Sequence, residues 1–95
     1  MVRNMAHRKK NISLQSFTRS EREILKLAAN GYEDDQIANE LSMSERTVKG
    51  LQVNLMRKWN VSTISSAIDY ALGSGVMTIY EILESRFRKR KPEVN

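Results

Sequence analysis

Residues 34–41 and 45–59 form two helical patterns separated by a short turn, and this pair constrains the fold more than any other feature. In the first pattern, apolar residues recur at steps of three and four residues, as on the buried face of a helix. Ser44 is suited to cap the second helix, which would begin at Glu45. The second pattern has its own apolar face, formed by Val48, Leu51, Leu55 and Trp59. Two helices joined by so short a turn predict a helix-turn-helix.

The face opposite this second apolar stripe is expected to be exposed and basic. Its residues are Arg46, Lys49, Gly50, Val53 and Arg57. Residues 45–58 contain four cations and one acid. A basic outer face on the second helix is typical of a recognition helix that enters the major groove of DNA.

The composition excludes several classes of protein. A chain of 95 residues forms one domain with a modest core. The absence of cysteine excludes disulfides and thiolate metal sites, and the single histidine, His7, has no partner in its polar surroundings. Because there is no glycine-rich phosphate loop and no evident catalytic pair, we expect no enzyme activity, no cofactor, no metal and no small-molecule ligand. No apolar run approaches the ~18 residues of a membrane span and no signal peptide is evident, so we expect a cytoplasmic protein without membrane contact.

The net charge of +5 is unevenly distributed along the chain. Residues 1–16 hold four cations and no acid, and residues 86–91 hold five cations, whereas residues 17–85 have seven cations and ten acids. This distribution suits a polyanion that is contacted by one helix and two basic tails. The alternative is that the tails are simply solvated chain ends. We expect residues 1–16 to be flexible.

Two further helices are expected before residue 77. The first would begin at Thr18, where Thr18 and Glu21 form a capping box, and would end at residues 30–31. The other would be capped by Ser62 or Thr63 and would end at residues 73–75, which contain two glycines.

A fifth, amphipathic helix is predicted over residues 78–90, with Pro92 as its stop signal. Its apolar face consists of Ile79, Ile82, Leu83 and Phe87. This face must be buried, either against the rest of the chain or against a partner chain.

With these helices in order, the sequence resembles the LuxR/GerE-type DNA-binding domain. The resemblance depends on an ordered set of motifs: Phe17-Thr18, Glu21-Arg22-Glu23-Ile24-Leu25, Gly31, Gln36-Ile37-Ala38, Met43-Ser44-Glu45-Arg46-Thr47-Val48-Lys49, Val61, Ala67 and Gly75. It covers residues 17–77, which leaves a basic tail at residues 1–16 and an added C-terminal helix with a basic tail at residues 78–95. The resemblance implies an all-α domain of four helices, here followed by the additional amphipathic helix.

The resemblance also implies that the third helix of the domain, residues 45–59, enters the major groove. Lys49, Gly50 and Val53 would then face the bases, with Lys49 donating to guanine and Val53 packing on a thymine methyl group. Gln52 lies beside them and could pair with adenine. The residues expected at the DNA backbone are Ser44, Arg46, Thr47, Arg57 and Lys58.

The fourth helix of this family commonly pairs two subunits on a two-fold DNA site, so we expect a homodimer on double-stranded DNA. The residues expected at a dimer or partner interface are Ala67, Tyr70, Ala71, Ile79, Ile82, Leu83 and Phe87. Only 16 residues precede the domain, too few for a sensor domain, so we expect a stand-alone, GerE-like bacterial transcription regulator associated with the nucleoid.

A second hypothesis is a protein-interaction module that keeps this fold and binds another transcription regulator. The acidic run Glu33-Asp34-Asp35 and the apolar face of the last helix motivate it. We interpret the three acids themselves as residues that stabilise a helix N-terminus through its dipole.

Overall fold

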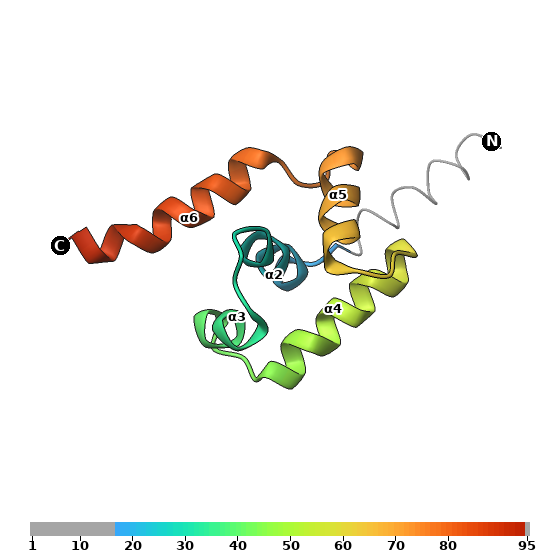
Figure 1. The fold of residues 1–95 in the computed structure, drawn as a ribbon, viewed down its shortest axis with the longest axis horizontal. Coiled ribbons are helices and arrows are strands. Elements are labelled where there is room, and N and C mark those ends of the chain that lie inside the picture. Colours follow the sequence, from blue (N-terminus) through green and yellow to red (C-terminus); the bar gives the residue numbers. More distant parts are fainter. Residues whose placement is uncertain (1–16, 95) are drawn as a thin grey trace.

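The computed structural model describes the backbone of residues 17–94 and the side chains of residues 17–86. The described part consists of five helices and contains no β-strand: α2 (Arg19–Ala29), α3 (Asp34–Leu41), α4 (Glu45–Trp59), α5 (Ile64–Ser74) and α6 (Ile79–Val94). This confirms the predicted all-α fold with an added C-terminal helix. Figure 1 shows α3 and α4 below α2, α5 above the C-terminal end of α4, and α6 leading away from the bundle. The tail at residues 1–16 and the Phe87 side chain lie outside the described part.

The capping residues of the sequence determine where the helices begin. The Thr18 hydroxyl accepts a hydrogen bond from the Glu21 N–H at 3.1 Å, and the Glu21 carboxylate accepts one from the Thr18 N–H at 3.0 Å. This reciprocal pair is the predicted capping box of α2. Ser44 caps α4 as predicted, and Thr63, rather than Ser62, caps α5.

The turn between α3 and α4 contains a residue in the left-handed conformation. Ser42 has a φ of 57° and a ψ of 46°. A residue with a Cβ atom adopts this conformation at a cost of about 1–2 kcal/mol. The Met43 N–H then donates to the Ala38 carbonyl oxygen at 2.9 Å, which satisfies an acceptor at the end of α3. The chain thereby reverses within three residues and lays α4 against α3.

Two clusters of buried side chains hold the helices together. One joins α2, α3 and α4 and consists of Ile24, Leu27, Ile37, Ala38 and Val48. The other joins α2, α4, α5 and α6 and consists of Phe17, Leu25, Leu55, Ala67, Ala71, Met77 and Ile82. Because α4 contributes to both clusters, its inner face is held along its length and its outer face is left free.

Helix α6 packs inward against α2. Arg22 forms an ion pair with Glu81, and the Asn30 side-chain amide donates to the Ile82 carbonyl oxygen at 2.9 Å. Ile82 and Ser85 are buried, at 6% and 5% exposure. Burial within the chain thus applies to Ile82, whereas Ile79 and Leu83 of the same apolar face remain exposed.

Two predictions about the C-terminal half were wrong. Ala67, Ala71 and Ile82 were expected at an interface with another chain, but they are 0%, 0% and 6% exposed because they fill the second core cluster. Pro92 was expected to end the last helix, but α6 extends to Val94. A proline at position 92 removes one hydrogen bond, to the carbonyl of residue 88, but this loss is confined to the last turns because only two helical residues follow it.

Candidate nucleic-acid interface

The outer face of α4 carries the three residues predicted to read bases. Lys49, Gly50 and Val53 are all exposed, with the Lys49 side chain at 66% and Val53 at 48%. Apart from its chain neighbours and the adjacent backbone of α4, no described atom lies within 4 Å of the position that a Gly50 Cβ atom would occupy. Figure 1 shows α4 at the edge of the bundle. The face therefore combines a donor, an open stretch of backbone and an apolar side chain.

The N-terminal turn of α4 presents further polar groups. The Ser44 hydroxyl accepts from the Thr47 N–H at 3.0 Å and donates to the Thr47 hydroxyl oxygen at 2.9 Å. The Thr47 hydroxyl consequently keeps its own proton available for an outside acceptor. Arg46 is also exposed, and no carboxylate of the described residues pairs with it.

The two neighbouring cations near the end of α4 have different surroundings. Arg57 is exposed and has no acidic partner among the described residues. Lys58 instead directs its ammonium group to Glu21 of α2, at 2.9 Å, and this carboxylate side chain is only 1% exposed. A buried carboxylate without a partner would be costly, so Lys58 pairs with the buried Glu21 carboxylate rather than extending toward a phosphate.

Gln52, which the sequence placed beside the base-reading face, is buried at 8% exposure. Its amide donates to a carboxylate oxygen of Asp34 at 3.1 Å. Because a helix turns by about 100° per residue, position 52 lies between the outer face and the core and points toward α3. The structure therefore assigns Gln52 to the contact between α3 and α4, not to a base.

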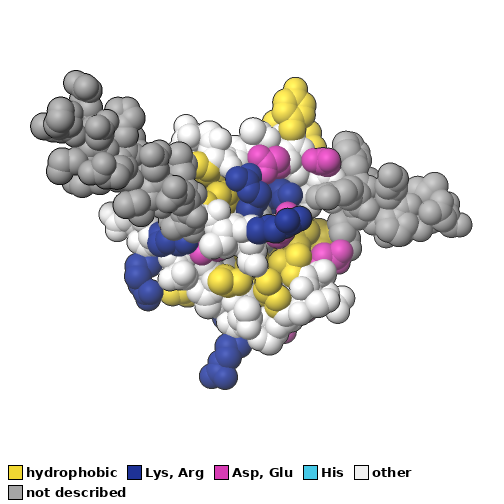
Figure 2. Space-filling view, turned by 180° about the vertical axis from the view of Figure 1, so that it is seen from behind, with side chains coloured by type: hydrophobic (Ala, Val, Ile, Leu, Met, Phe, Trp, Pro, Cys, Tyr) yellow, Lys and Arg dark blue, Asp and Glu magenta, His cyan; other side chains and the backbone are white. Residues whose placement is uncertain are grey.

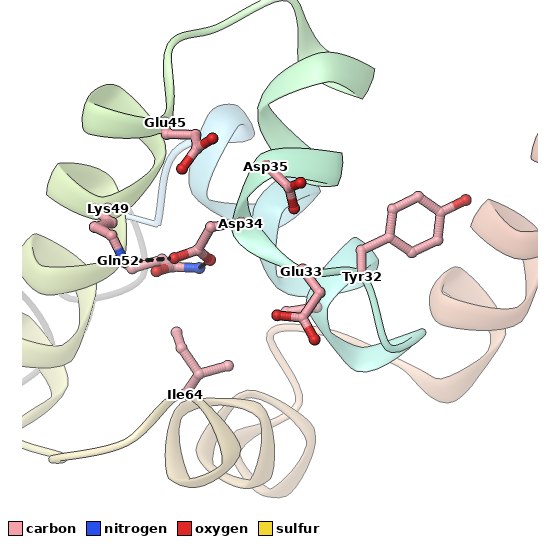
Figure 3. A pocket seen from close by; sticks show the side chains of 9 residues that line it. Tyr32, Glu33, Asp34, Asp35, Glu45, Lys49, Gln52 and Ile64 are labelled. Carbon is pink, nitrogen blue, oxygen red and sulfur yellow. Dashed lines mark hydrogen bonds and ion pairs between the residues drawn. The ribbon is translucent and has the colours of Figure 1, made fainter.

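Asp34, at the first position of α3, also pairs with Lys49, at 2.9 Å. The hydrogen bond from Lys49 lowers the pKa of the Asp34 carboxyl below its usual 3.8, and the same bond raises the pKa of Lys49. The pair lines an open hollow of about 560 Å³ whose other polar side chains include Glu33, Asp35 and Glu45. Figure 3 shows Lys49 and Gln52 reaching from α4 to Asp34 at one side of this hollow.

Of the residues predicted at an interface between chains, Tyr70, Ile79 and Leu83 remain exposed, at 43%, 54% and 39%. The Tyr70 ring packs on Trp59 with ring centroids 4.7 Å apart, so one side of Tyr70 is occupied. Tyr80, which the sequence analysis did not select, is 79% exposed at the start of α6. The sequence could have indicated this exposure, because Tyr80 lies outside the apolar stripe of the predicted helix.

The described residues offer no alternative kind of site. No group of three or more His, Cys, Asp or Glu side chains in this part of the chain is arranged to hold a metal ion. None of the described helices is both long and apolar enough to cross a membrane. Figure 2 shows one face on which the Lys and Arg side chains are scattered, several of them beside Asp and Glu.

Comparison with known proteins agrees with this geometry. Residues 15–71 match the family described as bacterial regulatory proteins, luxR family. The uncharacterized response regulatory protein YgeK of Escherichia coli K12 is 42% identical over 62 residues, which are 65% of this chain and 42% of that protein. The response regulator protein TodT of Pseudomonas putida is 41% identical over 54 residues, 57% of this chain and 24% of TodT.

The transcriptional regulatory protein DegU of Brevibacillus brevis is 36% identical over 62 residues, which are 65% of this chain and 26% of DegU. The chain thus spans less than half the length of each of these relatives. The matched family segment includes α2, α3 and α4 complete, and with them the helix-turn-helix.

Proposed function

Because the chain belongs to the luxR family of bacterial regulatory proteins, we propose that it regulates transcription by reading DNA sequence with α4 in the major groove. The observation that carries the proposal is the exposed face of Lys49, Gly50 and Val53 on a helix whose other face is fixed in the core. A rigid helix with one free face can present the same side chains to every duplex it meets.

The three residues of this face have distinct proposed roles. Lys49 donates to the O6 and N7 acceptors of a guanine, and Val53 packs on the methyl group of a thymine. Gly50 has no side chain, so the helix backbone can approach the floor of the groove closely.

Other exposed groups of α4 are proposed to contact phosphates and thereby set the position of the helix. They are the guanidinium groups of Arg46 and Arg57, which no described carboxylate pairs with, the Thr47 hydroxyl and the capped N-terminus at Ser44. Phosphate contacts fix register and orientation but carry no sequence information. Lys58 and Gln52 are left out of the proposed DNA contacts because each is engaged within the protein.

We further propose that two copies bind one palindromic site. A two-fold protein arrangement places two recognition helices in successive major grooves, one helical turn of DNA apart. The exposed part of Tyr70 on α5 remains available for such a contact. Ala67 and Ala71 are not available, because they are buried in the core. The alternative function, capture of another regulator through α6, has less support because Ile82 of its apolar face is buried against α2.

Substitutions at two positions of α4 test the proposed roles. Lys49→Ala should relax the preference at a single base pair, by about 1–3 kcal/mol. Arg57→Ala should weaken binding to all sequences alike and reduce the slope of log affinity against log salt by about 1. Both effects can be measured by fluorescence anisotropy, with duplexes that differ at single positions and at several salt concentrations.

The two variants serve as controls for each other, since both remove an exposed cation from the same helix. If Lys49→Ala weakened every duplex equally and changed no base preference, α4 would not be reading bases through Lys49. Thermal unfolding of both variants would show whether a loss of binding reflects a loss of folded protein.

A further inference from the structure

The carboxylate of Asp34 makes two hydrogen bonds that cross from α3 to α4. One oxygen accepts from the Lys49 ammonium group at 2.9 Å, and the other accepts from the Gln52 amide at 3.1 Å. Both oxygens are thus engaged by the proposed recognition helix (Figure 3). The two partners lie three residues apart, on neighbouring positions of the α4 surface.

The three side chains differ in their exposure. Gln52 is buried, the Asp34 side chain is 29% exposed and the Lys49 side chain is 66% exposed. Gln52 therefore fixes the carboxylate from the inside, and the carboxylate holds the ammonium group at the surface. An ammonium group has three N–H donors, so one bond to Asp34 leaves two donors for an outside acceptor.

The surroundings of the pair discourage contacts with phosphate. Glu33, Asp35 and Glu45 line the same hollow, so its surface is acidic beside Lys49. The hydrogen bond from Lys49 lowers the pKa of the Asp34 carboxyl, which agrees with a close pair between the two side chains. Without such surroundings, a lysine ammonium group is a point charge on a flexible stem that can turn toward a nearby phosphate.

We propose that Asp34 is a specificity-determining positioning residue, which holds the Lys49 ammonium group so that it donates to a base acceptor rather than to a phosphate. This inference rests on the proposed function, since it assumes that Lys49 faces the bases. It assigns Asp34 a second role besides stabilising the N-terminus of α3. The neighbouring Asp35 shares the helix N-terminus and the charge but makes no bond to α4.

The test compares Asp34→Asn with Asp35→Asn. Each variant removes one negative charge from the first turn of α3, so binding to random duplexes should become tighter in both. Only Asp34→Asn should reduce the preference at the base pair read by Lys49, by about 5- to 150-fold, the range for one lost specific contact. It should also steepen the salt dependence on random duplexes by up to about 0.9, because the released Lys49 adds one phosphate contact.

A double variant shows whether Asp34 acts through Lys49. In a Lys49→Ala background, the additional Asp34→Asn change should leave base preference unaltered. Asparagine retains an acceptor for Gln52, and Asp34→Ala, which has a high helix propensity at this first position of α3, provides a second variant should the first unfold.

The outcomes distinguish a failure of this inference about Asp34 from a failure of the proposed function. If the wild-type chain prefers a base at this position and Asp34→Asn preserves the preference, the inference is overturned and the proposed function stands. If Asp34→Asn and Asp35→Asn reduce the preference equally, Asp34 acts only through its charge, and the inference is again overturned. A wild-type chain without any base preference would contradict the proposed function itself.

Discussion

Gly50 lies in the interior of α4, between Lys49 and Val53 on the outer face. Apart from its chain neighbours and the adjacent backbone of α4, a Cβ atom at this position would meet no described atom within 4 Å, so packing against other helices does not require glycine here. A glycine inside a helix destabilises it by roughly 0.5–1 kcal/mol relative to alanine. The reason for a glycine at this position is therefore expected outside the chain, in the close approach of another molecule.

We predict that Gly50→Ala stabilises the protein and weakens its binding to DNA. The free energy of unfolding should rise by about 0.5–1 kcal/mol, because the unfolded chain loses conformational freedom. DNA affinity should fall because the added methyl group separates the helix from the bases. Urea unfolding and fluorescence anisotropy measure the two effects.

Gly73→Ala is the matched control, since Gly73 is also an exposed helical glycine with open space around it. It should stabilise α5 without loss of DNA affinity. DNA affinity that is equal in Gly50→Ala and in the wild type would argue against close contact at Gly50.

At the same scale, the sequence predicted the exposed face of α4 well. It predicted side-chain partners poorly, and it placed Ala67, Ala71 and Ile82 at an interface although they are buried. Helical periodicity alone placed Lys49, Gly50 and Val53 on the exposed face of α4. It could not place Gln52 or Lys58 correctly, because their carboxylate partners lie 18 and 37 residues away along the chain. Such contacts depend on how helices cross, which a helical repeat does not encode.

At the scale of elements, α6 is docked on α2 by polar contacts as well as by Ile82. Arg22 pairs with Glu81, and Asn30 bonds the backbone of α6. The sequence predicted all five helices of the described part and the caps Thr18 and Ser44, because capping boxes and apolar repeats are local signals, but it did not identify Glu33 as the cap of α3. It could not predict what covers the apolar face of α6, because burial against α2 and burial against another chain require the same stripe.

The docking of α6 should depend on pH through Glu81. Partial burial raises the pKa of this carboxyl, but the bonds from Arg22 and from the Thr78 backbone, with the charge of Lys26, outweigh it and hold the pKa below its usual 4.5. A group whose pKa is lowered in the docked state contributes stability above its usual pKa, and loses it as the pH falls through the lowered value. We therefore predict that α6 loosens as the pH falls below about 4.5.

Amide hydrogen exchange along α6 between pH 6 and pH 3 measures this effect, after correction for the intrinsic exchange rates. Glu81→Gln should remove much of the acid dependence, and Glu84→Gln, a change at an exposed position of the same helix, should preserve it. Equal acid dependence in both variants would show that another group controls the docking.

At the scale of the whole molecule, the positive charge is concentrated at the two ends of the chain and not in its middle. Residues 17–85 carry more acids than cations, and two of the four cations of α4 are paired with carboxylates. The scattered cations in Figure 2 agree with this balance. Residues 17–85 therefore add little long-range attraction to phosphate, and the proposed function assigns sequence discrimination to the outer face of α4.

Selection of bound sequences from a pool of random duplexes, at low and at high salt, tests the central claim of base reading by α4 most directly. The pool contains every short sequence, so the selection itself identifies any preferred DNA site. We predict that one palindromic motif is enriched at both salt concentrations, because base contacts persist where phosphate contacts weaken. Binding that enriches no sequence and disappears at high salt would contradict the claim, since charge alone would then hold the DNA.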